Sequence, residues 1–159
     1  MIGYYSDEVL LGSINQAYFK ISKAKKSLLG FRFGKTDCWS LFCLYDSLLR
    51  NGDSKLHEKI TNYSSNFTFE REFLKAGFLT AEDFFLSSKY EITNYKNKRL
   101  GDVAFATGTV YNSKTVFINT GRGWLNSGPD PTFDLVPYNM VSKIYAIGRP
   151  IMEDNNEDT

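Results

Sequence analysis

The stretch that decides the fold of this chain is TDCWSLFCLYDSLLRNG, residues 36–52. Thr36 is a typical helix-capping residue and Asn51-Gly52 is a typical stop signal, so the pattern predicts a helix that ends at about Arg50. Its first apolar face comprises Cys38, Leu41, Phe42, Tyr45 and Leu49. Trp39 and Cys43 form a second apolar face. Because two faces are apolar, we expect this helix to lie buried at the centre of the fold.

A second, amphipathic helix is predicted ahead of it, from residue 7 to about residue 28. Its apolar residues follow helical spacing at Leu10, Ile14, Ala17, Tyr18, Ile21 and Leu28. Ser6 can cap this helix, and Asp7 and Glu8 suit the positive end of its dipole. The last turns are rich in lysine, at Lys20, Lys23, Lys25 and Lys26. We interpret these lysines as a solvated helix end, with an anion-binding patch as the alternative.

The rest of the chain changes from helical to strand-like patterns. A short helix is predicted over 69–76, ending at Gly77, and another begins with Thr80 as its cap. Candidate strands follow at 102–106, 114–119, 123–126 and 143–148. The short turns between them favour antiparallel hairpins. The predicted fold class is therefore α+β, with N-terminal helices packed on one face of a C-terminal antiparallel β-sheet.

Composition limits the possible classes of protein. The chain has 159 residues, which fits one domain, and we assign 1–150 to it and 151–159 to a polar, acidic C-terminal tail. A hydrophobic content of 42% argues against disorder, and no apolar run reaches the roughly 18 residues of a membrane helix. The start resembles no secretory signal, and we expect no membrane insertion. A net charge of +1 gives no electrostatic case for a nucleic-acid partner.

The candidate reactive residues are Cys38, Cys43 and His57, which are all the cysteines and histidines of the chain. They are too few, and wrongly spaced, for a disulfide framework or a structural zinc site, and no metal or organic cofactor is indicated. A cysteine in the first turn of a helix sees exposed N–H groups, which favour the thiolate and lower the thiol pKa. Cys38 is therefore a candidate nucleophile, while the alternative is a small apolar residue of the core.

Several motifs together resemble the NlpC-type cell-wall cysteine peptidases, papain-like enzymes that cleave peptide bonds in peptidoglycan. Asp37-Cys38 opens a helix directly after the glycine-bounded aromatic loop 30–34. Residues 100–105 resemble the family's Gly-Asp strand entry, 116–123 its central hairpin, and 147–150 its terminal strand with Arg-Pro. Residues 73–78 resemble a helix of phage-encoded, tail-associated members. The resemblance spans roughly residues 10–150 and implies an NlpC/papain-like fold.

The chain departs from this family at the catalytic positions. The place of the catalytic histidine is taken by Thr115, or by Lys114 if the register is shifted. The polar residue that orients that histidine corresponds to Asn126 or Ser127. The loop tyrosine whose hydroxyl helps to hold the oxyanion corresponds to Phe31. His57 follows the end of the cysteine helix among polar neighbours, so we expect it to be solvated.

The resemblance and the missing base together favour a non-catalytic, NlpC-like structural or assembly component of a bacteriophage tail. Such a protein would assemble in the host cytoplasm, reside in the virion tail, and have other tail or virion proteins as partners. Two alternatives stay open. One is a cysteine endopeptidase on peptidoglycan peptides, with Cys38 as nucleophile and a base from His57 or a partner chain. The other is a module that binds a cell-wall peptide without cutting it.

Overall fold

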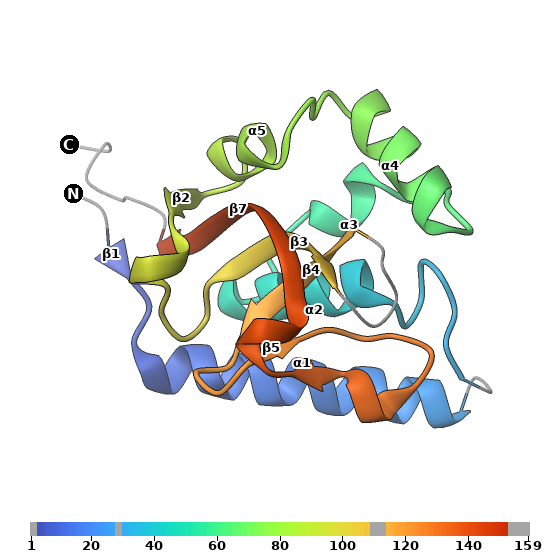
Figure 1. The fold of residues 1–159 in the computed structure, drawn as a ribbon, viewed down its shortest axis with the longest axis horizontal. Coiled ribbons are helices and arrows are strands. Elements are labelled where there is room, and N and C mark those ends of the chain that lie inside the picture. Colours follow the sequence, from blue (N-terminus) through green and yellow to red (C-terminus); the bar gives the residue numbers. More distant parts are fainter. Residues whose placement is uncertain (1–2, 28–29, 109–113, 153–159) are drawn as a thin grey trace.

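The computed structural model describes residues 3–27, 30–108 and 114–152 (Figure 1). Its helices are α1 (Asp7–Ser27), α2 (Cys38–Leu49), α3 (Leu56–Lys59), α4 (Asn66–Lys75) and α5 (Ala81–Leu86). Its strands are β1 (Gly3–Tyr4), β2 (Tyr90–Thr93), β3 (Val103–Gly108), β4 (Lys114–Asn119), β5 (Trp124–Leu125), β6 (Leu135–Val136) and β7 (Val141–Met152). Within these residues, no helix combines the length and the hydropathy that crossing a bilayer requires.

The strands form one antiparallel sheet, which confirms the predicted α+β class. Its order is β1-β7-β3-β4-β5-β6, and β2 also pairs with β7. β3 and β4 form a hairpin in which Val103 pairs with Ile118, and β7 pairs with β3 on the opposite side. β4 has the predicted bounds, whereas β7 is longer than the predicted 143–148 and reaches Met152, which pairs with Gly3. The rest of the predicted tail, 153–159, lies outside the described residues.

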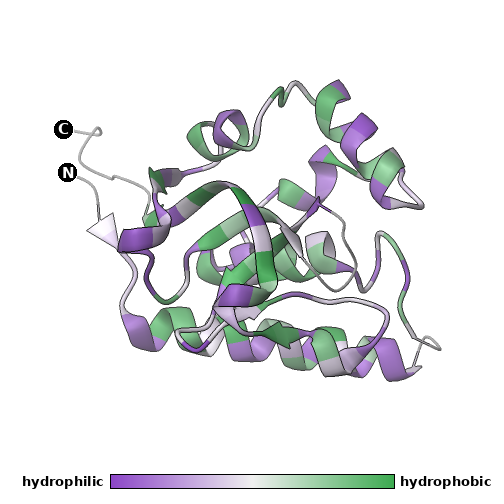
Figure 2. Cartoon of the chain, in the orientation of Figure 1, coloured by the Kyte–Doolittle hydropathy of each residue, from purple (hydrophilic) through white to green (hydrophobic). Residues whose placement is uncertain are grey.

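The helices pack on one face of the sheet, as predicted. The buried apolar side chains of α1, α2, α3 and α5 share one core with alternate strand residues, such as Val103 and Phe105. The intervening residues point to the other face, where Ala104, Ala106, Phe117, Trp124, Val136 and Ile147 form a smaller cluster. In Figure 1, α1 lies along one side of the molecule, with α4 and α5 on the opposite side. Figure 2 shows hydrophobic and hydrophilic residues interspersed along the whole of α1, as expected for a helix with one apolar face.

The central helix α2 begins one residue later than the sequence indicates. Asp37, not Thr36, is its N-cap, because the Asp37 backbone is extended and its carboxylate accepts the N–H of Ser40 at 3.2 Å. Thr36 is buried in the preceding loop, where its hydroxyl accepts the N–H of Arg32 at 2.8 Å. Thr80, by contrast, caps α5 as predicted, in a capping box with Asp83.

The Gly-Asp and Arg-Pro motifs of the resemblance meet in the sheet. Arg149 on β7 donates two hydrogen bonds, both of 2.9 Å, to the buried carboxylate of Asp102. Gly101 has a φ of +89°, and a Cβ built there would lie 2.7 Å from a methyl group of Leu10. These motif residues therefore have structural roles, since they fix the start of β3 against β7 and α1.

Candidate functional site

The first residue of α2, Cys38, lies against strand β4. Its sulfur contacts the hydroxyl of Thr115, in a hydrogen bond in which either group can be the donor. Of the two positions that the sequence left open for a base, Thr115 is the one beside the thiol. The ammonium of Lys114 lies instead over the ring of Tyr145, 4.4 Å from its centroid.

The residues predicted to form the site come together around one hollow. This hollow has a volume of about 410 Å³, and we call it the Cys38 hollow. It is lined by Phe31, Phe33, Asp37, Cys38, Asn66, Thr115, Asn126, Ser127, Gly128 and Pro129. The four positions matched to the peptidase family, Phe31, Cys38, Thr115 and Asn126, are therefore neighbours in space although they are far apart in the chain.

Residues 126–134 form a loop, which we call the 126–134 wall, whose first four residues line the Cys38 hollow. Hydrogen bonds from its own polar groups hold this loop in place. The side-chain amide of Asn126 donates to the backbone carbonyls of Phe133 at 3.2 Å and Asp134 at 3.1 Å. The hydroxyl of Ser127 donates to the carbonyl of Thr36 in the loop before α2. Asn126 and Ser127 therefore stabilise the conformation of the loop, because their side-chain donors bind backbone carbonyl oxygens.

A buried ion pair anchors the same wall to α1. Lys25 is only 7% exposed and donates at 3.0 Å to the carboxylate of Asp134, which also accepts the hydroxyl of Tyr18 at 2.8 Å. The interpretation of the lysine run as a solvated helix end is therefore wrong for Lys25. The sequence could not show this, because Lys25 is buried by the distant loop that supplies its partner.

The surroundings of Cys38 favour its protonated thiol over the thiolate. Burial raises the pKa of the Cys38 thiol to about 12, and the negative charge of Asp37 acts in the same direction. The hydrogen bond with Thr115 and the nearby backbone groups oppose this shift without reversing it. This direction is opposite to the lowering expected at a helix start, because desolvation is the largest cause and the charge of Asp37 adds to it. Burial also raises the pKa of Cys43.

Tyr63 is part of the site and was missed by sequence reasoning. Its hydroxyl donates at 2.6 Å to the Asp37 carboxylate, and its ring packs against Phe33 at a centroid distance of 6.3 Å. Burial, followed by the charge of Asp37, raises the pKa of Tyr63. The residue lies between the predicted end of the central helix at about Arg50 and the short helix predicted over 69–76, where no sequence pattern connects it to the start of α2.

The single histidine lies elsewhere. The side chain of His57, on α3, is 65% exposed, which confirms that it is solvated. It lines a different hollow, together with Trp39, Cys43 and Tyr63, and it is not among the residues around Cys38. In the described segments there is also no group of three or more His, Cys, Asp or Glu side chains that could hold a metal ion.

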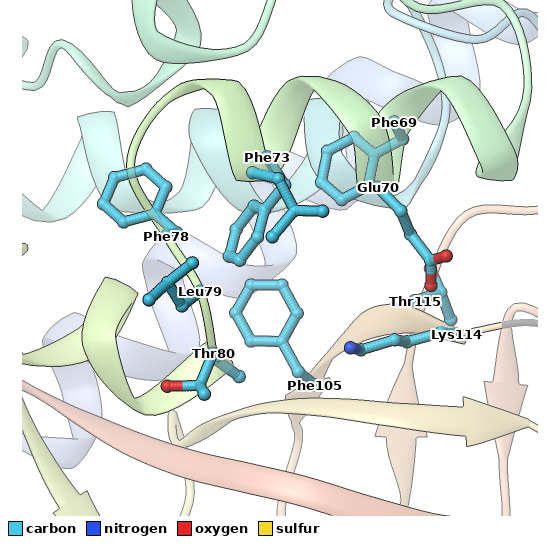
Figure 3. Close-up of a pocket in the computed structure, with 11 residues that line it drawn as sticks. Phe69, Glu70, Phe73, Phe78, Leu79, Thr80, Phe105, Lys114 and Thr115 are labelled. Atoms are coloured by element: carbon cyan, nitrogen blue, oxygen red, sulfur yellow. The ribbon is translucent and has the colours of Figure 1, made fainter.

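A third hollow adjoins the site and was not anticipated from the sequence. It lies between α4, the segment Phe78–Ala81 and the strands β3 and β4 (Figure 3). Its lining is Phe69, Glu70, Phe73, Leu74, Phe78, Leu79, Thr80, Ala81, Phe105, Lys114 and Thr115. We call it the aromatic hollow. It shares Thr115 with the Cys38 hollow, so the two meet at the residue that contacts the thiol.

Comparisons with known proteins identified no relative of this chain. No protein-family model, no curated protein and no solved structure matches the chain.

Proposed function

We propose that this chain is a non-catalytic, NlpC-like protein with a papain-like arrangement, which serves as a structural or assembly component of a bacteriophage tail. The observation that carries the proposal is the contact between Cys38 and Thr115. A hydroxyl occupies the place beside the thiol where a cysteine peptidase of this type would have an imidazole.

The chemistry of the site supports a protein without peptidase activity. Only the thiolate is a competent nucleophile, and a thiol whose pKa is about 12 is protonated at neutral pH. Thr115 cannot accept the thiol proton at that pH, and loss of a general base costs about 10²–10⁴-fold in rate. Phe31 lines the Cys38 hollow without a hydroxyl to offer an oxyanion, which removes a further source of transition-state stabilisation.

The assembly role is supported by the segment that resembles phage tail-associated members. Residues 73–78 include the end of α4, and large apolar side chains are exposed on and just after this helix. These side chains are Phe67, Leu74 and Leu79. Exposed apolar groups gathered in one region favour an interaction with another protein.

A cell-wall peptide-binding module is the second candidate, and the open Cys38 hollow favours it. The hollow combines the Phe31 and Phe33 rings with polar groups of Asn66 and of the 126–129 loop, a mixture typical of ligand sites. Binding to purified peptidoglycan that is lost in a Phe31→Ala variant and kept in an exposed control, Phe19→Ala, would favour this candidate.

The first experiment measures muropeptide release from purified bacterial peptidoglycan by the wild-type chain and by Cys38→Ala. An active peptidoglycan peptidase on the same substrate shows that the assay works. We expect no release from either protein, with both shown to be folded by circular dichroism. Release that depends on Cys38 would overturn the non-catalytic assignment and establish the endopeptidase alternative.

The second experiment locates the protein in particles of a phage that encodes it. Mass spectrometry of purified virions and immunoelectron microscopy should place it in the tail. Its absence from virions and from tail-assembly intermediates would overturn the structural role, whatever the outcome of the enzymatic assay.

A further inference from the structure

The aromatic hollow has the size and lining of a receptor for one large apolar side chain. Its volume is about 220 Å³, and its walls include the rings of Phe69, Phe73, Phe78 and Phe105. Phe73 is central, with ring centroids 5.1 Å from Phe78 and 5.5 Å from Phe105. A dry apolar cavity of about 150 Å³ holds a benzene molecule, whereas sites for drug-sized ligands measure about 300–1,000 Å³.

The polar groups of this hollow are few, and most of them lie toward one end. Figure 3 shows Glu70 and Lys114 on the same side of the rings, where Thr115 also lies. The carboxylate of Glu70 and the ammonium of Lys114 give the hollow an acceptor and a donor without a net charge. This pairing suits a neutral main chain, which presents an N–H and a C=O beside each side chain.

The surroundings of the hollow favour a protein over a small molecule. Leu79 lines the hollow and is 78% exposed, and Leu74 on α4 is also exposed. Phe67 lies seven residues before Leu74, so both project from a common side of α4. A small ligand inside the hollow would leave these side chains in water, whereas a protein segment crossing the hollow would cover them.

We infer that the aromatic hollow is a docking pocket for an extended segment of a partner protein, which inserts one phenylalanine or similarly large apolar side chain between α4 and β3. The main chain of that segment lies beside Glu70 and Lys114, at the end of the hollow that meets the Cys38 hollow at Thr115. This inference deepens the proposed function, on which it rests for the identity of the partner as another tail or virion protein.

The test is an amide-detected NMR titration of the whole chain with a short, blocked polyalanine peptide that carries one central phenylalanine. The same peptide with a central serine and free phenylalanine are the comparison ligands. We expect the phenylalanine peptide alone to saturate, with the largest shifts in α4 and in Phe78–Ala81. Equal binding of the serine peptide, equal binding of free phenylalanine, or shifts confined to other elements would each overturn the inference.

Two leucines provide matched variants for the same titration. Leu79 is 78% exposed and lines the hollow, whereas Leu86 is 70% exposed on α5 and does not line it. Because both side chains are exposed, Leu79→Ser and Leu86→Ser should fold equally well. We expect Leu79→Ser to weaken binding of the phenylalanine peptide about tenfold and Leu86→Ser to change it less than about twofold. Equal effects of the two substitutions would contradict the inference.

The failure of this inference is distinguishable from the failure of the proposed function. If the chain is found in phage tails but does not bind the phenylalanine peptide, the proposed assembly role stands and the proposed docking pocket is refuted. If the chain binds the peptide as described but is absent from virions and from assembly intermediates, the docking pocket stands and the proposed tail role is refuted.

Discussion

The thiol of Cys38 at the start of α2 contacts the hydroxyl of Thr115 on β4. The contact joins the central helix to the sheet at the point where two hollows meet. A threonine hydroxyl can share a hydrogen bond with a thiol but cannot hold its proton at neutral pH, so the pair stays uncharged. The pair thus holds the start of α2 against β4.

The raised pKa predicts a thiol that resists alkylation. In the folded protein the pKa of Cys38 rises from 9.0 to about 12, which lowers the thiolate fraction at pH 8 about a thousandfold. We therefore expect iodoacetamide to modify Cys38 about that much more slowly than glutathione, with mass spectrometry as the readout. The rate should rise about tenfold per pH unit from pH 8 to pH 10.

The control for this measurement is the same protein in denaturant, where Cys38 should react like an ordinary thiol. A Cys43→Ala background ensures that only one cysteine is counted. Alkylation of folded Cys38 within about tenfold of the glutathione rate would contradict the raised pKa.

Replacing Thr115 with histidine should place a base beside the Cys38 thiol. An imidazole beside the sulfur can accept its proton and stabilise the thiolate, so Thr115→His should speed alkylation of Cys38 at pH 8 by at least about tenfold. Thr115→Val removes the hydroxyl without adding a base and should give no acceleration. If the two variants react at the same rate, burial and Asp37 alone control the thiol.

The local sequence predicts α1, α2 and the hairpin of β3 and β4 because each carries its own periodicity and stop signals. The four positions matched by motif order, Phe31, Cys38, Thr115 and Asn126, line one hollow in the structure. The strands β1, β2 and β6 were missed because segments of two to four residues are too short to show an alternating pattern.

The electrostatic details could not be predicted because they depend on residues distant in the chain. Lys25 is buried by Asp134, and Asp37 is joined by Tyr63, so neither partner is visible in the local sequence. The pKa of Cys38 was predicted with the wrong sign for the same reason. The helix dipole is a local property, whereas desolvation depends on the folded chain.

The burial of Lys25 predicts that alanine substitutions at Lys25 and at its neighbour Lys26 change the free energy of unfolding by very different amounts. Lys25→Ala leaves the Asp134 carboxylate buried without its cation, so we expect the free energy of unfolding to fall by about 3 kcal/mol. Lys26→Ala, at an exposed position of the same turn, should change it by less than about 0.5 kcal/mol. Urea unfolding followed by circular dichroism measures both, and equal losses would show that the ion pair does not anchor the 126–134 wall.

The pair between Arg149 and Asp102 predicts that a charge-conserving substitution is not conservative. Lysine keeps the positive charge but cannot donate the two parallel hydrogen bonds that Arg149 makes. We expect Arg149→Lys to lower the free energy of unfolding by about 1–3 kcal/mol. Arg71→Lys, at an exposed position on α4, is the matched control and should be nearly neutral. Equal thermal stability of the two variants would contradict this role for Arg149.

The hydrogen bond from Tyr63 to Asp37 predicts how stability depends on alkaline pH. Burial and the Asp37 charge raise the pKa of Tyr63 above its ordinary value of 10.0, so the unfolded chain loses this proton first as the pH rises. The stabilisation is therefore complete below pH 10 and declines above it, by up to about 1.4 kcal/mol per pH unit for one group.

Tyr63→Phe removes the titrating hydroxyl, so its free energy of unfolding should fall less steeply than that of the wild type between pH 10 and pH 11. Phe69→Leu weakens the ring contact with Tyr63 without removing a proton, so it should lower stability at every pH and keep the wild-type slope. Parallel curves for the wild type and Tyr63→Phe would show that this hydroxyl does not carry the alkaline loss.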